Sequence, residues 1–233
     1  MFNSEYETHC THEAMHHYQI RLCNTFDEYM QNMSSKSRNV QRKKVKLLYK
    51  HFQEDVELIR IDSPDDVETF LEEAVKISSQ SWQIELGQQM SVCKYETDEH
   101  IKMAEKKYLR SYLLRCGSDY LAFVRGYQFG DVYYYSRPAY DKNYSDYSPG
   151  AVLLNLVLQD LHLHRPPKII NFQEGDYDYK RLYSTEVLLK CHLLVWKKAN
   201  VSIPIVGIKL FNQFEKFKDF AKKNSIIRSI FKK

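Results

Sequence analysis

Residues 147–172 read YSPGAVLLNLVLQDLHLHRPPKIINF, an apolar segment of helical length followed by a short apolar run. From 151 to 162 the apolar residues recur at helical spacing, and Pro166 and Pro167 end the helix. The apolar run 168–172 (KIINF) then predicts a central strand that is buried on both faces. A helix that leads directly into a buried strand is typical of an α/β sheet covered by helices.

A run of strands is expected before this segment. Residues 112–116, 120–129 and 132–140 are β-rich and are separated by turns at 117–119 and 130–131, which predicts an antiparallel meander. Within the third strand, Tyr134 points to the opposite face from its two tyrosine neighbours. One of these faces belongs to the core, and the other either lines an acceptor groove or reflects ordinary β propensity.

The first hundred residues predict further elements. Ser34 or Ser35 caps a basic helix that runs to residue 50, with seven Lys/Arg and no acid. We expect its buried stripe to consist of Val40, Val45, Leu47, Leu48 and Phe52. A strand at 56–61, a Pro-initiated helix at 62–77 and a helix at 100–109 follow, and beyond the central strand we expect a helix within 174–183 and a last strand at 188–196.

The composition limits the class of protein. The chain has 233 residues, of which 27% are charged and 43% apolar, with 7 Gly and 6 Pro, so a collagen-like or wholly disordered chain is excluded. No run of eighteen apolar residues occurs, so no span of a bilayer is predicted. The five cysteines are scattered without a CxxC pair, which predicts a cytoplasmic protein with neither a disulfide framework nor a cysteine-rich zinc site.

The charge is divided unevenly along the chain. Residues 197–233 carry ten Lys/Arg and two acids, whereas the rest has a net charge of −4. This pattern disfavours a nucleic-acid-binding domain. We therefore divide the chain into a lead-in (1–35), a main folded domain (36–198) and a basic amphipathic tail (199–233). The tail is either an interfacial helix that holds the protein at the inner face of a membrane or a terminal helix docked on its own domain.

Several motifs in order resemble a known family. They are Tyr140-Asp141, the segment 147–154 (YSPGAVLL), Phe172 with Gly175, and Tyr179-Lys180. Together with the basic helix and Trp82, they resemble the CelD-like (BioF2-like) acetyltransferases of the GNAT class and, more distantly, Fem-type aminoacyl-transferases. The resemblance covers about residues 18–196. It implies a GNAT-like α/β core with a mixed, mostly antiparallel sheet.

The resemblance also implies a function. We expect N- or O-acyl transfer from acetyl-CoA or another acyl-CoA to a small-molecule or sugar acceptor, in cell-envelope polysaccharide or related biosynthesis. Two departures favour a non-catalytic GNAT-like binding or scaffold protein as the alternative. Only about 35 residues precede the basic helix, so either the first GNAT-like half of the family is missing or the protein works as a minimal one. The pyrophosphate signature Q/R-x-x-G-x-G/A is replaced by residues 144–150, which leaves other acyl donors open.

The donor site is expected at the start of the helix that follows residue 148. Tyr147, Ser148, Pro149 and Gly150 place backbone N–H groups at a helix N-terminus, which attracts phosphate, although Ser and Pro suit any helix start. Lys180 would pair with a phosphate or a sugar carboxylate.

The catalytic groups are expected just after the central strand. Glu174 could act as a base and Tyr179 or Tyr183 as an acid, because acyl transfer needs both; the alternative is a solvated acidic turn. The acceptor groove would use Trp82, Tyr134 and Asp176.

One further motif points to a different class of enzyme. His12, Glu13 and His16 match HExxH, the pattern of zinc hydrolases, in which the two His share one face of a helix. Only eleven residues precede the motif, too few for the sheet that a zincin places before this helix. A zinc hydrolase is therefore the minor alternative.

Overall fold

The computed structural model describes residues 6–10, 14–85, 87 and 89–197, which fall into two compact units. One unit spans residues 17–188, and the other is formed by the two ends of the chain. The strands are β1 (Tyr6–Cys10), β2 (Met15–Arg21), β3 (Val56–Ile61), β4 (Ser111–Cys116), β5 (Asp119–Phe129), β6 (Val132–Tyr140), β7 (Ile169–Glu174), β8 (Glu186–Lys190) and β9 (Leu193–Lys197). The helices are α1 (Phe26–Asn32), α2 (Ser35–His51), η1 (Pro64–Asp66), α3 (Val67–Ser78), α4 (Lys94–Glu105), η2 (Lys142–Tyr147), α5 (Pro149–Leu163) and α6 (Asp178–Tyr183).

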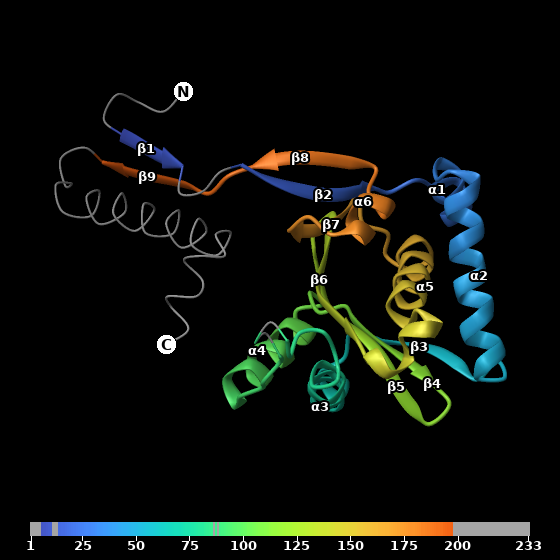
Figure 1. Ribbon diagram of the computed structural model, residues 1–233. Coiled ribbons are helices and arrows are strands. Elements are labelled where there is room, and N and C mark those ends of the chain that lie inside the picture. The colour runs from blue at the N-terminus through green and yellow to red at the C-terminus, as the bar shows by residue number, and fades with distance from the viewer. Residues whose placement is uncertain (1–5, 11–13, 86, 88, 198–233) are drawn as a thin grey trace, which may run out of the picture. The chain divides into compact units, whose positions relative to one another are not determined.

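A seven-stranded sheet in the order β3-β4-β5-β6-β7-β2-β8 forms the centre of the large unit (Figure 1). β3 to β6 pair antiparallel, β6 and β7 run parallel, and β7 and β2 pair antiparallel. This mixed sheet confirms the predicted fold class, and β7 is the central strand expected from KIINF. The prediction that this strand is buried on both faces is wrong, because Ile170 and Phe172 are buried while Ile169 and Asn171 are half-buried.

Helices cover both faces of the sheet (Figure 1). α1, α2 and α5 pack over the face that buries Tyr112 and Leu114, whereas α3 and α4 pack over the face that buries Leu113 and Phe123. Successive residues of β4 therefore enter different cores, as the period of two in a strand requires. Ser34 caps α2 as predicted, because its Oγ accepts the Ser37 N–H at 3.1 Å.

The buried face of α2 differs from the predicted stripe. Val40 and Leu47 are 41% and 47% exposed, and the buried residues are Gln41 and Leu48. A separation of seven residues is two helical turns, so Gln41 and Leu48 share the face that packs on α5. The pattern of apolar residues did not show this because one position of the buried face is polar.

Two other boundaries were wrong. α4 begins at Lys94 rather than at residue 100, because Cys93 and Glu96 form a capping box there. The predicted last strand is two strands in two sheets, since β8 ends at Lys190 and β9 pairs with β1. None of the helices within the described part of the chain is long and apolar enough to span a membrane.

The division of the chain into residues 1–35, 36–198 and 199–233 remains a prediction. The compact unit already starts at residue 17, and β2 and α1 therefore belong to the same body as α2. The basic tail at 199–233 lies outside the described residues.

Candidate active site

A cavity of about 520 Å³ opens where β6 and β7 separate. The parallel pairing of the two strands covers three residue pairs, which end at Tyr134 and Asn171. Tyr135 and Ala139 from β6 and Phe172 and Glu174 from β7 then line the space between the diverging strands. The divergence therefore creates a site inside a sheet that is otherwise continuous.

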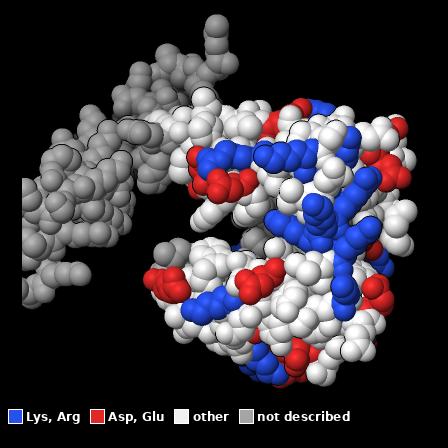
Figure 2. Space-filling view, turned by 45° about the vertical axis from the view of Figure 1, so that its right-hand side comes forward, with Lys and Arg blue, Asp and Glu red and all other residues white. Residues whose placement is uncertain are grey.

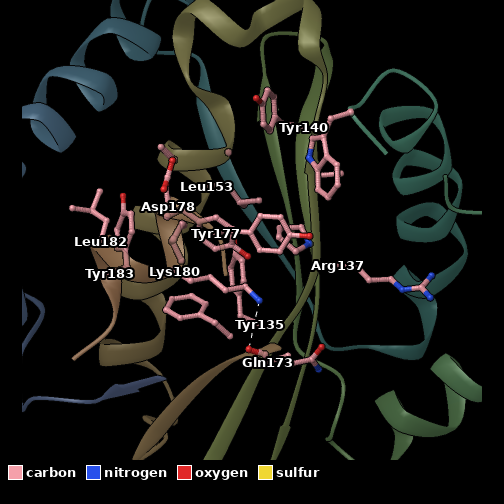
Figure 3. A pocket seen from close by; sticks show the side chains of 18 of the residues that line it. Tyr135, Arg137, Tyr140, Leu153, Gln173, Tyr177, Asp178, Lys180, Leu182 and Tyr183 are labelled. Carbon is pink, nitrogen blue, oxygen red and sulfur yellow. Dashed lines mark hydrogen bonds between the residues drawn. The ribbon is translucent and has the colours of Figure 1, made fainter. Parts of the chain in front are cut away.

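A β-bulge accompanies the divergence. Phe123 of β5 pairs with Ala139 and Arg125 pairs with Ser136, so one residue of β5 faces Arg137 and Pro138 together. Arg137 has a φ of 45° and Pro138 has no N–H to donate to a neighbouring strand. Figure 3 shows the Arg137 side chain pointing away from the cavity that its backbone borders. The charge of Arg137 is consequently directed elsewhere.

The left-handed conformation recurs around the cavity. Gln173 on the β7 wall has a φ of 60°, and Ser148, which precedes α5, has a φ of 52°. Non-glycine residues in this region cost energy and cluster at functional sites. Arg137 and Gln173 line the cavity and Ser148 lies two residues before Gly150, which also lines it, so these strained positions mark the cavity as the candidate site.

The start of α5 contributes one wall. Ser148 holds the N-cap position through its carbonyl, which accepts the N–H groups of Ala151 at 3.0 Å and Val152 at 3.1 Å, while its hydroxyl makes no cap bond. Gly150 borders the cavity, and a Cβ at this position would lie 2.9 Å from Cδ1 of Tyr140. Glycine is therefore required here by the close approach of the tyrosine ring.

Lys180 lies at the base of the site with 4% of its surface exposed. Its Nζ donates to the carbonyl oxygens of Glu174 and, at 3.5 Å, Gln173, and it lies 5.2 Å from the centre of the Tyr177 ring (Figure 3). Burial lowers the pKa of Lys180 to about 8, against a smaller opposing effect of Glu174. At neutral pH the Lys180 side chain is mostly a cation whose hydrogen-bond partners are carbonyl oxygens, and it becomes a neutral amine when the pH rises above about 8.

The two candidate acids differ in their hydrogen bonds. Tyr183 is buried, and its hydroxyl donates to Oε1 of Gln41 at 2.7 Å. Tyr179 packs on Phe172 and is half-buried, and its hydroxyl bonds to none of the described residues. Burial raises the pKa of both phenols, so each keeps its proton at neutral pH. Tyr179 is therefore the one whose proton is available to a ligand.

Glu174, the candidate base, sits at the end of β7. Its side chain is 44% exposed, and Oε1 lies 3.9 Å from Nε2 of His17 on β2. The carboxylate is therefore reachable from solvent and from the cavity that it helps to line.

The cavity brings six of the predicted site residues together: Trp82, Gly150, Glu174, Tyr179, Lys180 and Tyr183. Five lie away from its lining. The Tyr147 ring stacks on His51, with 3.9 Å between the ring centres. Ser148 is the N-cap of α5 and Pro149 is its first residue. Tyr134 stacks on Tyr127 at 4.8 Å, and Asp176 binds the Tyr18 hydroxyl and Arg181.

Sequence reasoning missed several lining residues. Gln41 and Lys44 come from α2, and Tyr135 and Gln173 come from the separating strands. Arg137-Pro138 inside a β-rich run could have indicated the bulge, because proline interrupts a ladder of hydrogen bonds. Gln41 gives no local signal, since its burial depends on the packing of α2 against α5.

The HExxH motif lies only partly in the described residues. Met15 and His16 begin β2, so this part of the motif is a strand rather than the helix that a zincin needs. His12 and Glu13 lie outside the described residues.

Comparisons with known proteins agree with this architecture. Among solved structures, FemX superimposes with a TM-score of 0.60 at 12% identity, covering 82% of this chain and 66% of that one. The C-terminal domain of a putative lysylphosphatidylglycerol synthetase from Agrobacterium fabrum gives 0.53 at 11% identity (87% and 65% coverage), and L-PGS from Bacillus licheniformis gives 0.53 at 15% (90% and 66%). The chain thus spans slightly less than two thirds of these structures, and at such identities the likeness shows the fold alone.

No curated protein matches the sequence. The family model described as "Acetyltransferase (GNAT) domain" matches residues 35–181, which is more than half of the chain. That range runs from the start of α2 to α6 and includes β6, β7 and most of the cavity lining. The chain therefore belongs to the GNAT acetyltransferase-domain family.

Proposed function

We propose that this chain is an acyltransferase that moves an acyl group from acetyl-CoA or another acyl-CoA to an amine or hydroxyl of a small-molecule or sugar acceptor. The observation that carries the proposal is the cavity between β6 and β7, because its lining contains a carboxylate (Glu174), a protonated phenol (Tyr179) and a lysine (Lys180). Acyl transfer needs such a set, since the acceptor must lose a proton and the leaving thiolate must gain one.

Each residue has a role in this proposal. Glu174 removes the proton from the acceptor as it attacks the acyl carbonyl. Tyr179 donates its hydroxyl proton toward the leaving sulfur, and Lys180 holds negative charge of the donor while it is protonated. Lys44 adds a positive charge on the α2 wall, and it makes no ion pair with any described residue. Trp82 and Tyr177, whose rings lie 6.3 Å apart, form an aromatic surface for the acceptor.

The acceptor class is the less constrained part of the proposal. The sequence motifs that resemble CelD-like and Fem-type transferases support a place in cell-envelope polysaccharide or related biosynthesis. A peripheral position at the inner face of a membrane through the basic tail is consistent with that role.

The first test is direct binding. Isothermal titration calorimetry of the full chain with acetyl-CoA and with longer acyl-CoAs should give saturable binding, and a thiol-release assay with amine and sugar acceptors should then show transfer. Absence of binding for every acyl-CoA would reject the donor.

The chemistry is tested by substitution. Glu174→Gln should lower turnover by roughly 10²- to 10⁴-fold, as expected for loss of a general base, with little change in donor affinity. Tyr179→Phe should cost less if the hydroxyl only positions the leaving group. Gln159→Met, on the exposed side of α5, is the control and should leave turnover unchanged. Full turnover in both site variants would place the chemistry elsewhere.

A non-catalytic binding protein is the second candidate, favoured by the start of α5. Pro149 has no N–H, and the N–H groups of Ala151 and Val152 are already bonded to Ser148. Few donors remain there for a pyrophosphate. Binding of an acceptor without binding or turnover of any acyl-CoA would support this candidate over the enzyme.

A further inference from the structure

Gln41 is an anomaly on the buried face of α2. It is 1% exposed, two turns from the fully buried Leu48, at a position where an aliphatic residue is expected. It also lines the cavity between β6 and β7. A buried amide in such a place is expected to have all of its hydrogen bonds satisfied.

The hydrogen bonds around Gln41 have a fixed direction. The carbonyl oxygen of Ala151 can only accept, so it must face the amide nitrogen of Asn155, at 2.8 Å. The same nitrogen donates to the Tyr183 hydroxyl at 2.8 Å, and that hydroxyl donates in turn to Oε1 of Gln41 at 2.7 Å. The chain of donors ends at Gln41, and its oxygen is therefore the atom held by Tyr183.

The amide nitrogen of Gln41 is left over. Its Nε2 is buried and bonds to none of the described residues. Turning the amide around would set this nitrogen against the Asn155 amide nitrogen, which lies 3.5 Å from Oε1, and would leave the Tyr183 hydroxyl proton without its acceptor. Asn155 and Tyr183 thus hold the Gln41 amide in one orientation, with its N–H groups unused. This is the arrangement of a preorganised donor, whose partner arrives with a ligand.

We infer that Gln41 is a ligand-binding residue whose amide N–H donates to a carbonyl oxygen of the molecule that occupies the cavity. A neutral amide donor suits a neutral acceptor such as an amide, thioester or ester carbonyl. The inference deepens the proposed function and rests on it for the identity of that molecule, which is the acyl donor. Asn155 and Tyr183 act through Gln41 as positioning residues.

The test observes the amide itself. In a ¹⁵N-labelled full-length chain, the Gln41 side-chain resonances are assigned by their loss in Gln41→Met and followed by NMR during titration with acetyl-CoA, CoA or acetamide. We expect a saturable downfield shift of an Nε2 proton. A shift with acetyl-CoA but not CoA identifies the acyl carbonyl, whereas a shift with both identifies an amide of the carrier.

The variants separate binding from folding. Gln41→Met should weaken binding of the active probe about tenfold, the effect of one lost hydrogen bond. Gln41→Glu keeps the oxygen that Tyr183 needs and should weaken binding similarly, so it serves if the Met variant does not fold. Gln159→Met is the matched control and should leave the affinity unchanged. The double variant Gln41→Met/Tyr183→Phe removes both members of the Gln41–Tyr183 bond and leaves Asn155 its bond to the Ala151 carbonyl, so it should be close to the wild type in stability.

The outcomes are distinct. If acetamide moves the Gln41 resonance but acetyl-CoA neither moves it nor is turned over, the binding role stands and the proposed acyl-CoA donor is wrong. If acetyl-CoA binds and shifts the Gly150 amide while Gln41 stays unmoved, the proposed donor stands and this inference is overturned. No movement with any of the three probes, or a strong loss of stability in the double variant, also overturns it and leaves Gln41 a structural residue.

Discussion

Lys180 combines deep burial with a proposed role, the binding of negative charge on the donor, that depends on its own charge. Burial lowers its pKa to about 8, so the side chain is a cation below that pH and a neutral amine above it. Lys180 therefore changes its charge within the pH range in which most enzymes are assayed.

We therefore predict that affinity for acetyl-CoA falls as the pH rises through about 8. The donor is anionic, and Lys180 loses its positive charge in that interval. Lys180→Arg keeps its charge and should show a flat profile between pH 7 and 9, at whatever affinity the longer side chain allows. Calorimetry across the pH series measures this, and a sloping profile in the Arg variant would assign the titration to another group.

Arg110 is also a buried cation, but unlike Lys180 it forms an ion pair with a carboxylate, that of Asp160. It is 2% exposed, and its Nη2 donates to the Asp160 carboxylate at 2.8 Å and to the His164 carbonyl at 2.6 Å, at the end of α5. Burial of Asp160 opposes ionisation, but hydrogen bonds from Tyr112 and Arg110 outweigh it and lower the pKa of the carboxyl.

Arg110→Leu should lower the free energy of unfolding by about 3–5 kcal/mol, because it leaves Asp160 without its buried partner. Since the folded pKa of Asp160 is depressed, its contribution to stability is present above the unfolded pKa and is lost as the pH falls through the folded value. Urea unfolding at neutral and acidic pH tests both points. A variant that loses equal stability at both pH values would show that packing, and not the ion pair, dominates.

Most of the elements could be predicted from the sequence, and the site only in part. Period-two and helical patterns located β3 to β7 and α5, because these residues alternate or recur according to burial. The two strands after residue 185 were merged, since a short turn at Cys191-His192 carries no Gly or Pro signal. Gln41 and the separation of β6 from β7 arise from contacts between distant segments, which no local pattern records.

The start of α5 can be tested by substitution at Gly150. Gly150→Glu places an anion at the helix N-terminus and should abolish donor binding, but any Cβ there also meets the Tyr140 ring at 2.9 Å. Gly150→Ala is therefore the control: it should cost roughly 1–3 kcal/mol of stability through overpacking and retain measurable donor affinity. Calorimetry and thermal unfolding of both variants separate charge from crowding, and equal affinities would refute a donor site at this helix.

Across the whole molecule, the unit formed by residues 17–188 has its own sheet and two cores, one on each face. Such a unit is expected to fold without the basic segment at the end of the chain.

Deletion of residues 205–233 should therefore leave the unfolding temperature within a few degrees of the full chain. If the tail is an interfacial helix, the shortened protein should no longer sediment with anionic vesicles, and salt should weaken the association of the full chain, since each basic residue contributes about 1 kcal/mol near an anionic surface. Aggregation of the shortened protein would instead place the tail in the core.

The short parallel contact between β6 and β7 also sets a geometric rule for the site. With three residue pairs holding the strands together, the last pair acts as the pivot of a wedge. At roughly 3.3 Å per residue, Ala139 lies well beyond that pivot, so a difference of a few degrees in the angle between the strands changes the width of the opening there by about an ångström. The size of the group admitted is thus governed by the angle between two strands as much as by the side chains on them.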